Sequence, residues 1–107
     1  MHCFSSTPEF CLKLVQKGFY ISFAGNLTFK HSENLQEAIK VVPSEKLLLE
    51  TDSPYLSPIP LRGRINTPLN IIYTYKKAAE LRHISVEILI DQIINNFENF
   101  SKLLTQN

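Results

Sequence analysis

Two carboxylates stand where a buried strand is expected to end. Residues 47–56 read LLLETDSPYL, so three leucines give way to Glu50, Thr51 and Asp52 before a Ser-Pro pair. A carboxylate at the tip of a core strand is costly unless it is paired or bound to a cation. A simple turn is the alternative, because an Asp before Ser-Pro can hydrogen-bond its own backbone two residues on. The motif alone leaves a metal ligand and a turn former open.

The chain before these carboxylates begins with a helix and a strand. An apolar stripe predicts a helix over about residues 7–17, with Ser6 and Glu9 in a capping-box pattern. Gly18 marks its end, because glycine readily adopts the left-handed conformation at a helix C-terminus. Residues 19–23 are rich in aromatic and branched side chains and predict the first strand.

A second helix and strand follow with short connections. Ser32 is the predicted cap of a helix that runs to about residue 42, and residues 47–51 form the second strand. Strands separated by a helix pair in parallel through right-handed crossovers. A continuous leucine run fits a parallel strand that is covered on both faces. The order of elements therefore predicts an α/β fold.

The remainder of the chain is a loop followed by helices. Residues 53–66 are rich in proline, and such a loop at the C-terminal end of a parallel strand is where α/β folds place their chemistry. Helices are predicted over residues 67–82, from the cap Ser85 to about residue 95, and over 97–105.

Composition is ordinary for a soluble globular domain. The chain has 107 residues, 44% of them hydrophobic and 20% charged, which is enough for one small domain. It contains no apolar run of about 18 residues that would span a membrane, and no signal-peptide pattern. The two cysteines, Cys3 and Cys11, lack a CxxC spacing and predict a reduced, cytoplasmic protein. A zinc site made of His2, Cys3 and Cys11 is the alternative use of these residues.

Charge is unevenly distributed although the net charge is only +1. Cations outnumber anions in residues 58–82, which hold Arg62, Arg64, Lys76, Lys77 and Arg82 against Glu80. Such a patch could contact a phosphate. The alternative, for Lys76 and Lys77 in particular, is a solvated helix face.

Four stretches together resemble a known family. They are HCFSS at residues 2–6, GFYISFAGNLTFK at 18–30, LLLETDSPYL at 47–56 and PLRGRINTP at 60–68. In this order and spacing they resemble the C-terminal part of the TatD-type metal-dependent DNases, which are amidohydrolase-like hydrolases. That resemblance implies a (β/α)8 barrel, of which this chain would form the C-terminal portion.

The resemblance implies roles for His2 and for the two carboxylates. His2 would end the sixth barrel strand and bind a divalent metal ion, either Mg²⁺, Mn²⁺ or Zn²⁺. Asp52 would end the eighth strand, bind the same ion and accept a proton from the attacking water. A divalent cation prefers oxygen ligands and lowers the pKa of bound water. Glu50 shares the facing of Asp52 on the strand and would support the ligands or pack inside the barrel.

The RGxxNxP-like segment suggests substrate contacts. Arg62 and Asn66 would lie near the mouth of the site, where a guanidinium suits a substrate phosphate. A salt bridge that fixes the loop is the alternative for Arg62. Thr67 stands where the family often has Glu, and Ser5-Ser6 replaces a small glycine-containing sequence. Two further histidines, His31 and His83, match no ligand position and are predicted to lie on the surface.

Most of such a barrel is absent from these residues. The family's other metal ligands lie on its first five strands, and a (β/α)8 barrel needs about 250 residues. Residues 1–107 are therefore expected to be a C-terminal fragment, whose partner is the missing N-terminal barrel half from the same gene or a separate chain.

The predicted function is a cytoplasmic, metal-dependent deoxyribonuclease that acts on DNA. An inactive remnant that serves at most as an interaction module is the rival hypothesis, and amide or ester hydrolysis on the same fold is a third. The barrel also predicts geometry: strands 19–23 and 47–51 should be adjacent and parallel. His2 and Asp52 should then lie at one edge, with backbones about 10 Å apart across the first strand.

Overall fold

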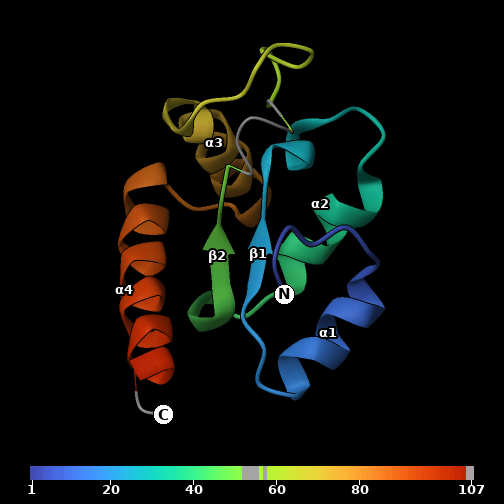
Figure 1. The fold of residues 1–107 in the computed structure, drawn as a ribbon. Coiled ribbons are helices and arrows are strands. Elements are labelled where there is room, and N and C mark those ends of the chain that lie inside the picture. Colours follow the sequence, from blue (N-terminus) through green and yellow to red (C-terminus); the bar gives the residue numbers. More distant parts are fainter. Residues whose placement is uncertain (52–55, 57, 106–107) are drawn as a thin grey trace.

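The computed structural model describes residues 1–51, 56 and 58–105 (Figure 1). Its centre is a two-stranded parallel sheet surrounded by helices. The elements, in chain order, are α1 (Pro8–Gln16), β1 (Ile21–Phe23), the 3-10 turn η1 (Gly25–Thr28), α2 (Glu33–Val41), η2 (Ser44–Lys46), β2 (Leu47–Leu49), η3 (Pro68–Asn70), α3 (Ile71–Arg82) and α4 (Val86–Thr105).

The sheet confirms the predicted parallel pairing. Ile21 lies opposite Leu47 and Phe23 opposite Leu49, and the Glu50 N–H continues the ladder by donating to Phe23 O at 2.9 Å. Both strands are shorter than predicted. The first strand begins late because the Phe19 N–H donates to Leu14 O at 3.1 Å, at the end of α1, and so cannot enter the sheet.

The N-terminal segment, residues 1–4, lies along β1 on the side away from β2 (Figure 1). The Ser22 N–H donates to Met1 O at 2.9 Å, and the Phe4 N–H donates to Ser22 O at 2.8 Å. A regular parallel ladder would advance two residues between these bonds. Here it advances three, and Cys3 takes up the extra residue in a left-handed conformation with φ +48°. The spatial order is therefore N-terminal segment, β1, β2.

Helix α1 is capped one residue later than predicted. The Phe10 N–H donates to Thr7 Oγ1 at 3.2 Å, so Thr7 and not Ser6 is the N-cap. Thr7 has the extended backbone that an N-cap requires, and its hydroxyl reaches the third helical residue. The helix ends before Gly18, whose φ of +89° confirms the predicted left-handed stop.

Helix α2 begins after Ser32 as predicted, but the Ser32 hydroxyl does not cap it. That hydroxyl instead donates to Phe29 O and Leu27 O in the preceding turn. At the other end of the helix, Arg82 Nη1 donates to Ile39 O at 2.6 Å and Val42 O at 2.7 Å. Burial lowers the pKa of this guanidinium from its ordinary value. Arg82 thus ties α3 to the end of α2.

Helix α4 replaces the two helices predicted near the C-terminus. Its 20 residues run without interruption from Val86 to Thr105. Neither Pro nor Gly lies within it, and asparagine only weakly disfavours a helix interior, so the predicted break near residue 96 was wrong. Ser85 is confirmed as the cap, since its Oγ accepts from the Ile88 N–H at 3.2 Å.

The hydrophobic core lies on one side of the sheet. Phe4 and Phe23 meet edge to face with ring centroids 5.6 Å apart, and inward-facing residues of α1, α2, α3 and α4 complete the cluster. Helix α4 runs beside β2 (Figure 1). No helix within the described residues has the length and apolar character needed to cross a membrane.

Asn96 joins α4 to the start of β2. Its Nδ2 donates to Ser44 O at 2.6 Å and Leu47 O at 2.8 Å, and the side chain is 2% exposed. We expect Asn96→Ala to lower the free energy of unfolding by about 2–3 kcal/mol, because it leaves the buried Leu47 carbonyl and the partly buried Ser44 carbonyl without this donor. Asn95→Ala, at an exposed position of the same helix, should change it by less than about 0.5 kcal/mol. Equal effects of both variants in urea unfolding would contradict this role.

Candidate functional site

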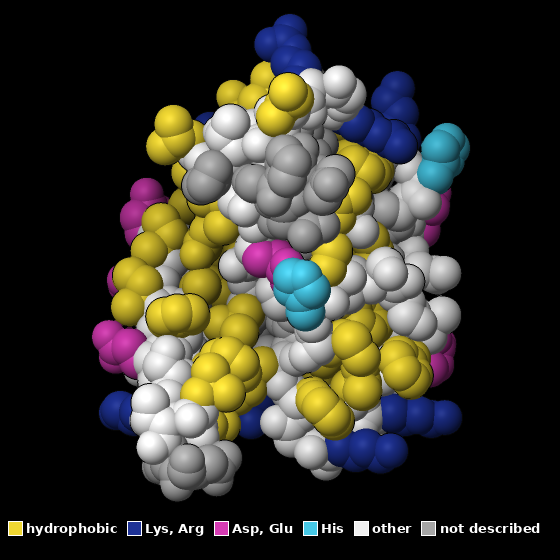
Figure 2. Space-filling model, viewed as in Figure 1, with side chains coloured by type: hydrophobic (Ala, Val, Ile, Leu, Met, Phe, Trp, Pro, Cys, Tyr) yellow, Lys and Arg dark blue, Asp and Glu magenta, His cyan; other side chains and the backbone are white. Residues whose placement is uncertain are grey.

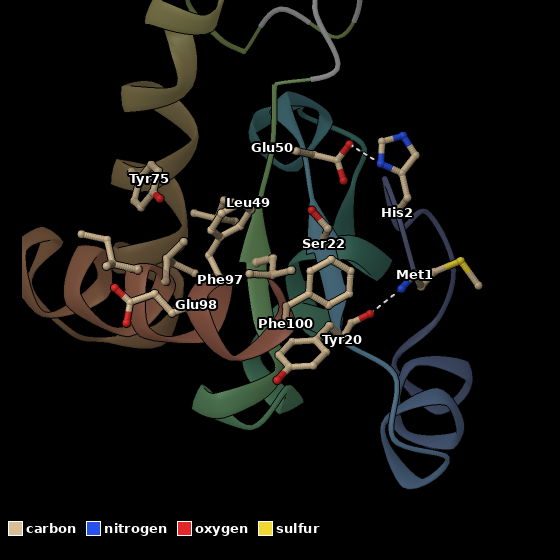
Figure 3. A pocket seen from close by; sticks show the side chains of 13 residues that line it. Met1, His2, Tyr20, Ser22, Leu49, Glu50, Tyr75, Phe97, Glu98 and Phe100 are labelled. Atoms are coloured by element: carbon tan, nitrogen blue, oxygen red, sulfur yellow. Dashed lines mark hydrogen bonds and ion pairs between the residues drawn. The ribbon is translucent and has the colours of Figure 1, made fainter. Parts of the chain in front are cut away.

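His2 and Glu50 meet at the C-terminal edge of the sheet (Figure 3). His2 Nδ1 lies 2.7 Å from Glu50 Oε1, and the Cys3 N–H donates to Glu50 Oε2 at 2.8 Å. The His2 side chain is 76% exposed and that of Glu50 only 17%. Glu50 is positioned by its backbone bond to β1, and His2 by the segment that runs along β1. The structure thus brings together two of the residues that the sequence singled out.

The Glu50 carboxylate is not fully satisfied by the described protein. Glu50 Oε1 is buried and accepts no well-aligned hydrogen bond from a described residue, although His2 Nδ1 is close. A buried carboxylate oxygen without a donor is costly. An imidazole nitrogen and a carboxylate oxygen are also common ligands of divalent cations. The pair therefore fits as one part of a metal-binding donor set.

The rest of that set is not among the described residues. Within residues 1–51, 56 and 58–105, no group of three or more His, Cys, Asp or Glu side chains is placed to hold a metal ion. Asp52, the predicted ligand and proton acceptor, lies outside the described residues. Its separation from His2 therefore stays a prediction.

The alternative zinc site of His2, Cys3 and Cys11 is wrong. Cys11 lies on α1 with no exposed surface, inside the hydrophobic core. Burial raises the pKa of its thiol, which disfavours the thiolate that zinc requires. Cys3 and Cys11 form no disulfide with each other.

Asn66 anchors the loop that follows β2. Its side chain is 3% exposed, its Nδ2 donates to Thr51 O at 2.7 Å, and its Oδ1 accepts from Asn70 Nδ2 at 3.1 Å. These bonds join the end of β2 to the start of α3. The geometry favours a positioning role for Asn66, and its predicted phosphate contact remains untested.

Arg62 is held by an aromatic ring. Its guanidinium carbon lies 3.9 Å from the centroid of the Phe29 ring, a cation–π contact. Among the described residues Arg62 forms no ion pair, so the loop is fixed by stacking in place of the salt bridge considered as the alternative. Sequence reasoning missed Phe29, because nothing local to residues 18–30 indicates a partner in the loop after β2. His31 and His83 are exposed, as predicted.

An open groove of about 650 Å³ lies between the sheet and α4 (Figure 3). Its floor is formed by Ser22, Leu48 and Glu50, which the pleat directs to the face opposite the core. Its wall is largely apolar and includes Phe97, Phe100, Ile93, Ile94, Tyr20 and Tyr75. Burial raises the pKa of the Tyr75 hydroxyl. Figure 2 shows hydrophobic side chains gathered along this part of the surface.

Comparison with known sequences gives a consistent result. A family model described as TatD related DNase matches residues 1–102. The chain is 43% identical over 97 residues to the uncharacterized metal-dependent hydrolase YcfH of Escherichia coli K12. The aligned region covers 91% of this chain and 37% of YcfH. It is 39% identical over 87 residues to the uncharacterized metal-dependent hydrolase YabD of Bacillus subtilis 168, covering 81% of this chain and 34% of YabD.

Solved structures agree with the sequence matches. Escherichia coli YjjV, a TatD homologue, matches with a TM-score of 0.83 at 27% identity over 90% of this chain and 37% of YjjV. A TatD family hydrolase from Entamoeba histolytica matches with a TM-score of 0.79 at 23% identity, over 91% of this chain and 40% of that protein. This second match shows similarity of fold alone. The chain spans a little over a third of YcfH, YabD and YjjV.

Proposed function

The chain belongs to the TatD-related DNase family, and from that premise we propose that it contributes to a divalent-metal-dependent deoxyribonuclease that hydrolyses phosphodiester bonds of DNA. The observation that carries this proposal is the His2–Glu50 pair, 2.7 Å apart at the C-terminal edge of a parallel sheet. Barrels built from parallel strands place their catalytic groups at that edge. YcfH and YabD are both described as metal-dependent hydrolases, which supports a metal-assisted reaction.

Each residue has a defined task in this proposal. Glu50 Oε1 lies 2.7 Å from His2 Nδ1, so it would orient the imidazole and leave Nε2 to face the metal. Asp52 completes this side of the donor set and accepts the proton of the attacking water. A divalent ion held there, Mg²⁺, Mn²⁺ or Zn²⁺, would supply a lowered pKa of bound water and positive charge opposite the phosphate.

We further propose that residues 1–107 form the C-terminal portion of a (β/α)8 barrel, within the cytoplasm. Three observations support this: the match to about 37% of YcfH, the spatial order of three parallel segments, and the open apolar groove. The partner would be the N-terminal barrel half, whether it belongs to the same chain or a separate one. Its strands would cover the groove and the exposed apolar side chains of α4, which are Ile88, Ile94, Phe97, Leu103 and Leu104.

A chimera tests the function directly. Residues 1–107 would replace the aligned segment of YcfH, and cleavage of single-stranded and duplex DNA would be followed with Mg²⁺, Mn²⁺ or Zn²⁺. We expect metal-dependent cleavage that EDTA abolishes, because the chimera restores the absent strands and their ligands.

Unmodified YcfH is the matched control. A folded chimera that is inactive on DNA while YcfH cleaves it would favour the inactive remnant, for which the apolar groove would serve only as an interaction surface. Hydrolysis of an ester or amide substrate without cleavage of DNA would assign the fold to the other substrate class.

A further inference from the structure

Two aliphatic side chains protrude from the segment that joins β2 to α3. Leu69 is 87% exposed and Ile65 is 79% exposed, the two highest values among the exposed large apolar side chains of the described residues. Neither of them lines the groove beside α4, so the surface proposed to receive the N-terminal barrel half does not include them. Keeping so much apolar surface in water is unfavourable, and a binding partner would relieve that cost.

A third residue, Ile72, extends these two side chains into a patch. Asn70 Nδ2 donates to Asn66 Oδ1 at 3.1 Å, which brings the preceding residues, Ile65 and Leu69, close together. The turn η3 runs directly into α3, and residues three apart share a face, so Ile72 lies beside Leu69. Ile72 is 40% exposed. Single exposed apolar side chains are ordinary, whereas a contiguous group of them marks a binding surface.

The loop holds this patch in a fixed shape. The Arg64 N–H donates to Leu61 O at 3.0 Å, and Gly63, with a φ of +92°, permits the turn that this bond closes. Asn66 is 3% exposed, and its bond to Thr51 O ties the loop to the end of β2. A surface that is already ordered loses little conformational freedom when it binds.

The patch has a basic surround. Arg64 is exposed and adjoins the patch in the chain, and Lys76 is exposed about one turn further along the same face of α3. Glu80 is the only acid in residues 58–82, and it lies 3.8 Å from Lys77 in an ion pair. Figure 2 shows hydrophobic and basic side chains together at the top of the molecule, where this loop lies in Figure 1. An apolar tip with a basic rim complements an anionic surface.

We propose that the patch of Ile65, Leu69 and Ile72 docks this protein on an anionic lipid membrane. The aliphatic side chains enter the boundary between headgroups and acyl chains, and Arg64 and Lys76 contact the lipid phosphates. Lipid is favoured over a protein because a protein would need a matching pocket for each protruding side chain, whereas fluid acyl chains adapt to them. The proposal does not depend on the nuclease function.

A fluorescent reporter tests the docking. The sequence contains no Trp, so Leu69→Trp places a single indole in the patch. Residues 1–107 would be titrated in EDTA with vesicles of phosphatidylcholine alone, or of equal parts phosphatidylcholine and phosphatidylglycerol. We expect a saturable blue shift of the emission with the anionic vesicles only, and a weaker one as NaCl is raised. Brominated lipid should quench the emission, because the indole lies next to the acyl chains.

Substitutions separate the apolar and the charged contributions. Co-sedimentation with the anionic vesicles gives the partition coefficient of the chain without the reporter. Ile65→Ser combined with Leu69→Ser should lower it about a hundredfold, since each buried aliphatic side chain contributes about tenfold. Arg64→Gln should lower it about fivefold. The controls Ile88→Ser on α4 and Lys13→Gln on α1 change exposed residues away from the patch and should leave it unchanged.

An equal loss with the Ile65/Leu69 double variant and with Ile88→Ser would mean general adsorption of apolar surface and would overturn the proposal. So would the absence of a saturable shift, or a shift with polyglutamate but not with vesicles, which would assign the patch to an acidic protein. Vesicle binding that is lost in the folded YcfH chimera would mean that the N-terminal half covers the patch, and would also overturn it. Vesicle binding by a chimera that fails to cleave DNA would leave this surface standing and remove the nuclease function alone.

Discussion

Asp52→Asn in the YcfH chimera is expected to reduce the rate of DNA cleavage by about 10² or more. Asparagine keeps the shape of the side chain but removes its charge and its capacity to accept a proton. Both are required if Asp52 binds the metal and takes the proton of the attacking water. The measurement is kcat/KM for a fluorescent oligonucleotide at saturating metal, together with the metal affinity from calorimetry.

The control for this substitution is Asp91→Asn. Asp91 is an exposed carboxylate on α4, so its loss removes the same charge without touching the site, and it should leave the rate almost unchanged. Activity of Asp52→Asn within a few-fold of the parent would return Asp52 to the simpler role of a turn former before Ser-Pro. A loss of folding would be visible as a lowered Tm in both metal-free and metal-loaded protein.

The alternation of helix and strand was predictable because it is a local property of the sequence. A leucine run, an aromatic-rich segment and two amphipathic stretches establish the types of element. The parallel pairing then follows from the short helical crossover. The ends of elements were less predictable. Thr7, and not Ser6, caps α1, and the Phe19 N–H donates to the end of α1 instead of entering the sheet. Both outcomes depend on backbone geometry at the scale of one residue, which sequence patterns do not resolve.

Long-range contacts account for most of what the sequence did not predict. Asn96 reaches Ser44 and Leu47, far away in the chain, and its burial is one reason that α4 continues where a break was expected. Arg62 stacks on the ring of Phe29, and nothing in the sequence around Phe29 indicates this contact. In contrast, His2 and Glu50 were identified in advance, His2 from the family resemblance and Glu50 from its facing on the strand. No pattern predicted their contact, because it depends on the N-terminal segment lying along β1.

Residues 1–107 alone are expected to show at most about a thousandth of the chimera's DNA cleavage rate. In this proposal the chain supplies only His2 and Asp52 as metal ligands, with Glu50 beside His2, so water would provide much of the coordination. His2 is 76% exposed, and the groove beside it is open, so solvent competes for every polar group that must be preorganised. Cleavage would be measured over hours with each of the three metals, using the chimera as the positive control.

Supplying the N-terminal part of YcfH as a separate chain should restore both activity and stability. Its strands would bury the apolar wall formed by Phe97, Phe100 and Ile94, and binding to the folded state alone raises Tm in a concentration-dependent way. A groove that instead served only as an interaction surface would show the rise in Tm without catalysis. Metal-dependent turnover by the isolated chain, abolished by Asp52→Asn, would show that these residues assemble a working site by themselves. The need for the absent strands would then be disproved, while the role of Asp52 would stand.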